Sequence, residues 1–148
     1  MRSRNSVSGF TLIELMIVVG IVAVLAAIAY PAYTQFIMQG NRTDATKTLQ
    51  LAAQSLERCY SVNFTYVGCT VNGNVQNDQS TMQTPNNYYT ITFNIPDPQD
   101  YSLVAVATAS PQTNDQCFQF TLFSSGQVAA QDVNSNPIIP AQTCWGSN

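Results

Sequence analysis

The sequence predicts an α+β chain in which one long, kinked N-terminal helix packs with its second half against a four-stranded antiparallel sheet. Three observations support this fold class. A continuous apolar segment lies near the start, a single apolar stripe at helical spacing follows it, and apolar and polar residues alternate between positions 88 and 123. The chain has 148 residues, enough for one domain with a modest core and an appendage.

The apolar segment runs from Phe10 to Tyr30, and Thr11 and Glu14 are its only polar side chains. As a helix it would be about 31 Å long, close to the thickness of the hydrocarbon core of a bilayer. Arg2 and Arg4 precede it, and no charged residue follows Glu14 until position 42. This asymmetry places the leader in the cytoplasm and the C-terminal part outside.

Two familiar kinds of export segment fit this pattern incompletely. A secretory signal peptide would be cut after a small-x-small site, and cleavage after Ala29 would satisfy that rule, whereas a signal anchor would keep the whole segment. Neither explains Glu14, since a carboxylate within a membrane span costs on the order of 3 kcal/mol. The acid therefore indicates a specific partner.

Residues 9–15 read GFTLIEL, and this string resembles the signature of type IV pilins and related pseudopilins. The resemblance implies that prepilin peptidase removes the leader, residues 1–9, by cutting between Gly9 and Phe10, and that the new Phe10 amine is methylated. The apolar segment, residues 10–30, is then kept for the membrane and for assembly. Glu14 would pair with the Phe10 amine of a neighbouring subunit, because a buried carboxylate without a partner is costly.

The same resemblance assigns an assembly role to Pro31, which matches a family proline near which the helix loosens. In the family, Ala commonly stands at the position of Gly20 and Gly at that of Ala23, so this chain has the two exchanged. Glycine and proline both weaken a helix. The start of any loosening therefore differs from the family pattern.

Residues 31–148 are predicted to form an amphipathic helix followed by a globular β-sheet domain. The apolar stripe consists of Ala45, Leu49, Ala52 and Leu56, continued by Cys59 or Tyr60. The Asn- and Gln-rich residues 72–87 read as a loop. Strands are expected at 88–94, 102–108, 117–123 and 127–131, before an irregular tail at 133–148.

Four cysteines allow three pairings, and an even count after an export segment indicates two disulfides in an oxidising compartment. We favour Cys59 with Cys69, on proximity, and Cys117 with Cys144, which would fasten the tail to the third strand. The second pair matches the C-terminal disulfide loop of many type IV pilins. Each would contribute about 3 kcal/mol by loop entropy.

Further landmarks resemble PilE-type minor pilins. They are the RTDA string at 42–45, LER at 56–58 followed by NFTY at 63–66, and Asp115-x-Cys117 leading to Cys144-Trp145. The resemblance covers the first 70 residues well and the rest at these landmarks. It implies the type IV pilin fold with a disulfide-closed C-terminal loop.

No catalytic, cofactor or metal chemistry is predicted, and the chain is not expected to be an enzyme. It has no histidine, which excludes His-based triads. Asp97 and Asp100 are expected to form a turn rather than a calcium loop. Arg42, Asp44 and Lys47 are expected on a solvated helix face. Removing the leader leaves three basic against eight acidic side chains, a net charge of −5, which argues against a general nucleic-acid surface.

The expected function is structural: a subunit, in particular a minor pilin, of a type IV pilus that polymerises through its apolar helix. The expected partners are other pilin subunits, the peptidase and methyltransferase, and the inner-membrane assembly machinery. The precursor would sit in the bacterial inner membrane and the product in an extracellular pilus. Adhesion, twitching motility and DNA uptake are all compatible. The alternatives are a type II secretion pseudopilin and a soluble periplasmic domain cut after Ala29.

Overall fold

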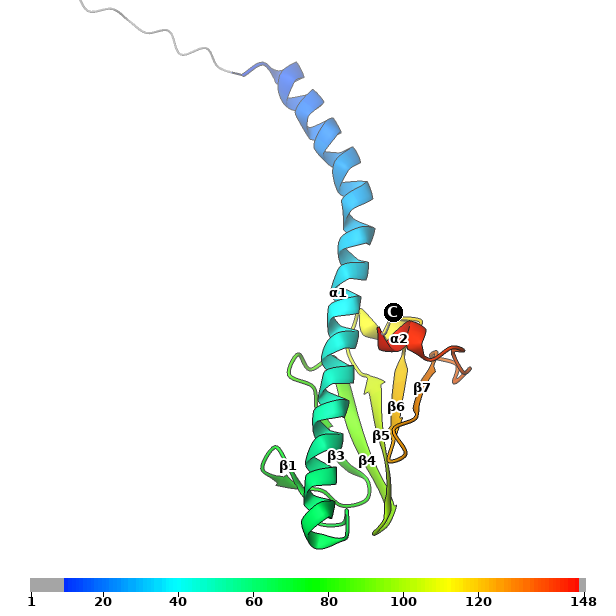
Figure 1. Ribbon diagram of the computed structural model, residues 1–148. Coiled ribbons are helices and arrows are strands. Elements are labelled where there is room, and N and C mark those ends of the chain that lie inside the picture. The colour runs from blue at the N-terminus through cyan, green and yellow to red at the C-terminus, as the bar shows by residue number, and fades with distance from the viewer. Residues whose placement is uncertain (1–9, 147–148) are drawn as a thin grey trace, which may run out of the picture. The chain divides into compact units, whose positions relative to one another are not determined.

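The computed structural model describes residues 10–146 (Figure 1). The chain divides into two units, one up to Phe36 and one from Ile37 onward. The helix α1 (Leu12–Asn63) contributes to both. The remaining elements, all in the second unit, are β1 (Thr70–Val71), β2 (Asn74–Val75), β3 (Ser80–Gln83), β4 (Tyr89–Asp97), β5 (Asp100–Ala107), the 3-10 turn η1 (Gln112–Asn114), β6 (Gln119–Phe123), β7 (Val128–Gln131) and α2 (Gln142–Trp145).

Strands β3 to β7 form one antiparallel sheet in the order β3-β4-β5-β6-β7. The four predicted strands correspond to β4, β5, β6 and β7, but the sheet has five strands, so the expected number was wrong by one. Strand β3 lies inside the segment that was predicted to be a loop. Its four residues are uncharged and at most half-buried, as suits a polar edge strand, and they give no alternating apolar signal.

The predicted loop also contains part of a second, two-stranded hairpin. Strands β1 and β2 are joined by Asn72 and Gly73, whose φ angles are +49° and +79°. Positive φ at both central residues is the requirement of a type I′ hairpin turn, and Asn-Gly is its preferred sequence. The prediction of an irregular segment therefore missed a turn signal that the sequence does carry.

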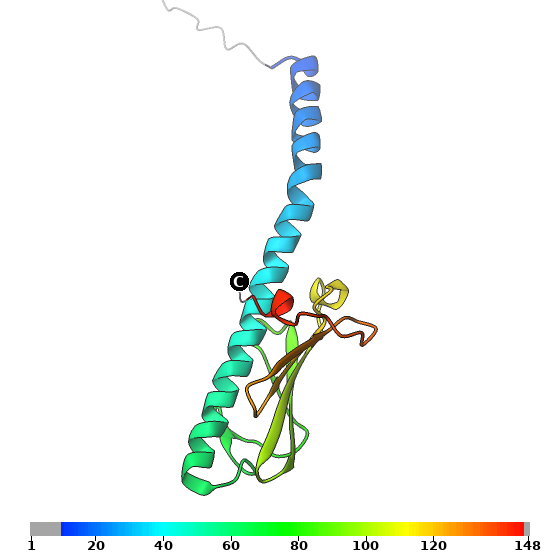
Figure 2. The same ribbon diagram turned by 45° about the vertical axis from the view of Figure 1, so that its right-hand side comes forward.

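The core of the second unit lies between α1 and one face of the sheet. Figures 1 and 2 show the second half of α1 lying along that face. The predicted stripe is confirmed, because Ala45, Leu49, Ala52 and Leu56 are all 2% exposed or less. They pack in one cluster with alternate residues of the central strands: Tyr89, Ile91, Phe93, Leu103, Ala105 and Phe120.

Two disulfides join Cys59 to Cys69 and Cys117 to Cys144, the two pairs favoured from the sequence. The first closes a loop at the end of α1, and the second fastens the C-terminal tail to the segment before β6. The tail is also more regular than expected, since it includes the short helix α2. The indole nitrogen of Trp145 donates to the Ala129 carbonyl at 3.0 Å, and the ring meets Phe120 edge to face.

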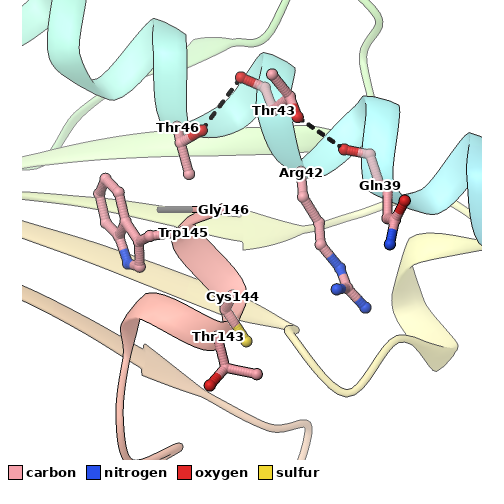
Figure 3. Close-up of a pocket in the computed structure, with 8 residues that line it drawn as sticks. All are labelled: Gln39, Arg42, Thr43, Thr46, Thr143, Cys144, Trp145 and Gly146. Atoms are coloured by element: carbon pink, nitrogen blue, oxygen red, sulfur yellow. Dashed lines mark hydrogen bonds between the residues drawn. The ribbon is translucent and has the colours of Figure 1, made fainter. Parts of the chain in front are cut away.

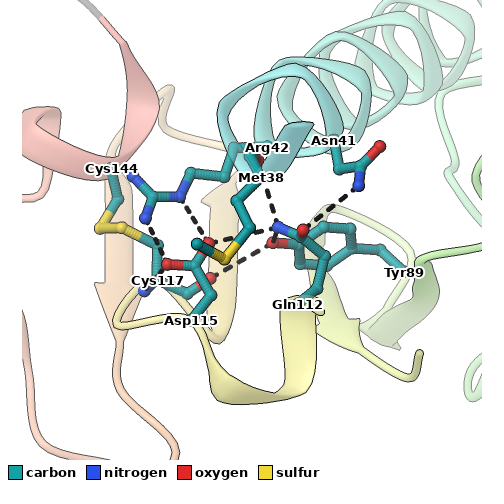
Figure 4. A network of polar contacts seen from close by, with 8 residues as sticks. All are labelled: Met38, Asn41, Arg42, Tyr89, Gln112, Asp115, Cys117 and Cys144. Carbon is teal, nitrogen blue, oxygen red and sulfur yellow. Dashed lines mark hydrogen bonds and ion pairs between the residues drawn. A yellow bond between two sulfur atoms is a disulfide. The ribbon is translucent and has the colours of Figure 1, made fainter. Parts of the chain in front are cut away.

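A buried polar network connects α1 with the loop before β6 (Figure 4). Arg42 binds both carboxylate oxygens of Asp115, a residue whose side chain is 2% exposed. The Gln112 amide donates to Asp115 at 3.2 Å, to the Tyr89 hydroxyl at 3.0 Å and to the carbonyl of Met38 at 3.2 Å. The expectation that Arg42 lies on a solvated face was wrong, because its side chain is only 16% exposed and is bound to the buried Asp115, 73 positions away in sequence.

Glu57 organises a second contact between α1 and the sheet. Its Oε1 accepts the hydroxyl protons of Tyr66 at 3.1 Å and Tyr101 at 3.0 Å, and the two rings meet edge to face. Burial, followed by the hydrogen bond to Glu57, raises the pKa of Tyr66 to about 12 and raises that of Tyr101 as well. Burial also raises the pKa of Tyr89 to about 12.

Replacing Asp115 with alanine should lower the free energy of unfolding by about 3 kcal/mol, because the Arg42 guanidinium would stay half-buried without its carboxylate. Urea unfolding of the purified full chain in detergent, with both disulfides intact, measures this loss. The double variant Arg42→Met/Asp115→Leu should recover part of the loss, since it leaves no unpaired charge. Equal stability of the double and single variants would contradict this account.

The raised tyrosine pKa values predict a loss of stability in alkali. The folded state favours the neutral phenol, so this contribution is complete below the unfolded pKa of about 10 and is lost as the pH rises from about 10 to about 12. Urea midpoints should fall over that window. The Tyr89→Phe variant has one proton fewer to lose, and its midpoint should fall less steeply. An identical slope would mean that Tyr89 ionises normally.

Candidate functional site

The most prominent functional feature is the apolar surface of the first half of α1. Its large hydrophobic side chains from Phe10 to Phe36 are 49–86% exposed. Within residues 10–146, α1 is also the one helix that is long and apolar enough to cross a membrane, and the most apolar 18-residue window in it is 0% buried. An exposed apolar surface of this size needs lipid or other protein to cover it.

Glu14 lies in the first turn of α1, at the start of this surface. Thr11 precedes the helix, and its hydroxyl oxygen accepts the backbone N–H of Glu14 at 3.3 Å. Thr-x-x-Glu is the sequence of a capping box, but only its threonine half is formed here, and an acid in the first turn also interacts favourably with the helix dipole. The side chain therefore has a local structural role in addition to the pairing predicted from the sequence. Its carboxylate has no hydrogen-bond partner within the described residues.

The other predicted site residues fall in different places. Gly9 lies outside the described residues, while Phe10 begins them and is 86% exposed. Pro31 lies within α1, where its missing N–H removes one backbone hydrogen bond. Gly20 stands in the apolar half, and a Cβ added there would meet no atom within 4 Å. Its own surroundings in this chain therefore leave room for a larger side chain.

A hollow of about 320 Å³ lies between α1 and α2 (Figure 3). Arg42 and the threonines at 43 and 46 line it from α1, and the stretch from Thr143 to Gly146 lines it from the other side. The Arg42 guanidinium is already bound to Asp115, and Cys144 is in a disulfide. These side chains include no nucleophile paired with a base, so the hollow has no constellation for catalysis.

Basic groups are few on the second unit. Arg42 forms the one ion pair found among residues 10–146, whereas Lys47 and Arg58 are exposed. In the same part of the chain, no three His, Cys, Asp or Glu residues are grouped closely enough to hold a metal ion. The chemistry that the described surface offers is therefore apolar burial and a small number of charges.

Comparison with known proteins assigns this architecture to a family. Residues 4–30 match the prokaryotic N-terminal methylation motif. Residues 31–121, more than half of the chain, match the family described as type IV minor pilin ComP, DNA uptake sequence receptor.

Curated relatives match over shorter stretches. Prepilin peptidase-dependent protein D of Escherichia coli K12 is 45% identical over 34% of this chain and 35% of its own length. A probable minor fimbrial protein of Dichelobacter nodosus is 44% identical over 40% of this chain and 38% of its own. Fimbrial protein Q of Moraxella bovis is 56% identical over 26% and 25%. The matches thus span between about a quarter and two fifths of these relatives.

A solved type IV pilin from Shewanella oneidensis resembles the structure, with a TM-score of 0.51 and 30% identity over 75% of this chain and 99% of that one. The family match, the exposed apolar helix, the antiparallel sheet and the C-terminal disulfide agree with one another. The chain belongs to the type IV minor pilin family and is a structural pilin.

Proposed function

We propose that this pilin is made as an inner-membrane precursor, is cut between Gly9 and Phe10 by prepilin peptidase, and is methylated on the new amine. Its assembly machinery then inserts it into a surface pilus, where the first half of α1 is buried against other subunits. The observation that carries this proposal is the apolar surface from Phe10 to Phe36. Burying about 800 Å² of it would contribute roughly 20 kcal/mol before entropy costs.

Glu14 gives this assembly its register. In the proposed filament its carboxylate binds the positive Phe10 amine of an adjacent subunit, so that neither charge stays unpaired in apolar surroundings. The open carboxylate and its position one turn from the helix start support this role. The Thr11 cap fixes the start of the helix, and so fixes where the carboxylate projects.

Glu14→Gln removes the charge of this residue while keeping the size and polarity of its side chain. The helix start is kept, because its cap comes from the Thr11 hydroxyl and the backbone N–H of residue 14, but the charge is lost. Burying the Phe10 amine without its carboxylate partner costs about 3 kcal/mol. This cost corresponds to a fall of about 100-fold in the share of the chain found in sheared surface filaments. Immunoblots of sheared filaments and of whole cells measure that share. Glu14→Asp keeps the charge and is the matched control.

The outcomes separate the alternatives. N-terminal sequencing should show Phe10 first, with a methylated amine, in the wild type and in both variants. A chain that starts at Tyr30 would identify a secretory signal peptide. Correct processing without any presence in surface filaments would favour a secretion pseudopilin. Normal incorporation of the Gln variant would contradict the charge pair.

The family description names DNA uptake, and the charges of this chain limit how it could bind DNA. DNA affinity rests largely on neutralising phosphates, and residues 10–148 hold three basic side chains, of which Arg42 is bound to Asp115. We infer that any part of this chain in DNA uptake depends on the filament, or on contacts to bases, rather than on a basic surface. The excess of acidic residues supports the same inference.

Binding of the purified chain without its leader, residues 10–148, to duplex DNA should therefore be weak and nearly independent of sequence. With two free cations, the logarithm of the affinity should fall with the logarithm of salt concentration at a slope of about −2. Fluorescence anisotropy at several salt concentrations measures the slope. A slope several-fold steeper, or a strong preference for one sequence, would show a nucleic-acid site that these charges do not explain.

A further inference from the structure

Lys47 and Arg58 lie on one face of α1. Eleven positions make slightly more than three helical turns, so both side chains project in nearly the same direction, about 16 Å apart along the axis. Both are exposed, and among residues 10–146 neither has a carboxylate at ion-pair distance. Leu51 lies between them on this face and is 62% exposed. This cationic face is formed by Lys47, Leu51, Gln54 and Arg58.

The two acidic side chains of the same helix segment, Asp44 and Glu57, accept hydrogen bonds from other groups and form no ion pair with Lys47 or Arg58. Asp44 accepts the backbone N–H of Asn86 at 3.3 Å. Glu57 accepts two tyrosine hydroxyls on the side of the sheet. The two positive charges are therefore not neutralised by their own helix, and they need an external anion for a strong contact.

The surface around Arg58 is hollowed on both sides. One groove, of about 360 Å³, runs from Thr48 and Leu51 to Met82 and Gln83 on the edge strand β3. A second, of about 420 Å³, lies between the end of α1 and the segment that contains Gly68 and Thr70. Both are lined by Ser55 and Arg58. The cationic face is thus bordered by space that a protruding segment can enter.

The complementary charge lies at the tip of the β4–β5 hairpin, residues 96–100, all of which are exposed. Asp97 and Asp100 face each other across the turn as a registered pair. Oδ1 of Asp97 accepts the N–H of Gln99 at 2.7 Å, and Oδ1 of Asp100 accepts the Ser124 hydroxyl. One oxygen of each carboxylate has no partner within the described residues. The tip is therefore an acidic knob with Pro98 at its centre.

The tip cannot reach the β3 groove of its own chain. Met82 pairs with Ile91 near the start of β4, whereas Asp97 ends that strand. Six residues of extended chain separate the two positions by about 20 Å. The hairpin is also held in place, since the carbonyl of Pro98 accepts the Tyr66 N–H at 2.9 Å. A contact between the knob and the β3 side of the groove therefore requires two molecules, although the knob of the same chain lies near the Arg58 end, where Tyr66 binds Glu57.

We propose that the acidic knob of one copy docks on the cationic face of a second copy, between Lys47 and Arg58. The two carboxylates lie on facing strand residues about 5 Å apart at Cα, and the long Lys47 and Arg58 side chains, about 16 Å apart along the axis, would bend toward a knob seated between them. The two surfaces differ, so the contact is heterologous and propagates from copy to copy, as a filament requires. The inference rests on the proposed filament, because that is where copies meet.

A zero-length carbodiimide crosslink tests this contact directly, because Lys47 is the only lysine in the chain. Sheared filaments, and the purified full chain concentrated in detergent, would be treated, digested and analysed by mass spectrometry. Mixing isotopically light and heavy chains shows whether a crosslink joins two copies. The expected product joins Lys47 of one copy to Asp97 or Asp100 of another. A product with a different carboxylate, or none between copies, overturns the proposal.

Charge variants supply the second measurement. Lys47→Gln/Arg58→Gln should reduce the share of the chain in filaments about tenfold, as expected for two exposed pairs. Gln127→Glu/Gln142→Glu changes the net charge equally at exposed positions elsewhere and should have no such effect. The reversal Lys47→Glu/Arg58→Glu should fail alone and recover when combined with Asp97→Lys/Asp100→Lys. Absence of recovery overturns the contact.

The two proposals fail in different ways. If the wild-type chain is absent from filaments, the proposed function fails, and the crosslink in detergent still decides the contact. If the chain enters filaments but the crosslink and the charge recovery are absent, the contact fails and the function stands. The variant Lys47→Gln/Arg58→Gln could instead lose DNA binding while its share in sheared filaments stays unchanged. That result would assign these cations to nucleic acid and overturn the proposal.

Discussion

The two halves of α1 have to be stable in different surroundings, one against the sheet and one in lipid or an assembly. The rest of the structure follows from this constraint. The second half of α1 buries a narrow stripe, from Ala45 to Leu56, against the sheet, and its other faces are polar. The first half is apolar on every side and exposed. A helix that is apolar all round is stable only in lipid or inside an assembly. The globular unit therefore has to fold and stay soluble on its own helix segment, independently of what covers the residues before Phe36.

That independence explains the density of cross-connections in the second unit. Two disulfides, the Arg42–Asp115 pair and the Glu57–tyrosine contacts fasten α1 and the C-terminal tail to the sheet. Cys117–Cys144, Arg42–Asp115 and Glu57–Tyr101 join residues 27, 73 and 44 positions apart, whereas Cys59–Cys69 and Glu57–Tyr66 close short loops. Each limits the freedom of the unfolded chain or satisfies a group that burial would otherwise penalise. A subunit drawn out of a membrane benefits from such connections, because tension on α1 then reaches the sheet through several contacts rather than through the core alone.

The parts of the fold that the sequence predicted are those with a local signal. Alternation at Tyr89, Ile91 and Phe93 gave β4, and spacing of three and four gave the buried stripe of α1. Strand β3 was missed because an exposed polar edge strand has no apolar face to alternate. The Arg42–Asp115 pair was missed for a different reason: no periodicity connects residues 73 positions apart, and only the folded chain brings them together. In the sequence these two residues stand out only within family landmarks, RTDA at 42–45 and Asp115-x-Cys117.

The small number of charges makes the role of each one easier to identify. Only 9% of the residues are charged, and the basic side chains of the globular unit number three. One of them, Arg42, is used inside the fold. A surface with two remaining cations cannot attract a polyanion strongly. It can distinguish one docking geometry from another, because a wrongly placed neighbouring subunit presents no carboxylate to either cation. Apolar burial along α1 supplies free energy without direction, since any rotation of one helix against another buries similar area. Orientation must then come from the few polar groups, and in this chain these are Glu14 at the helix start and the charges around Arg58 on the globular unit.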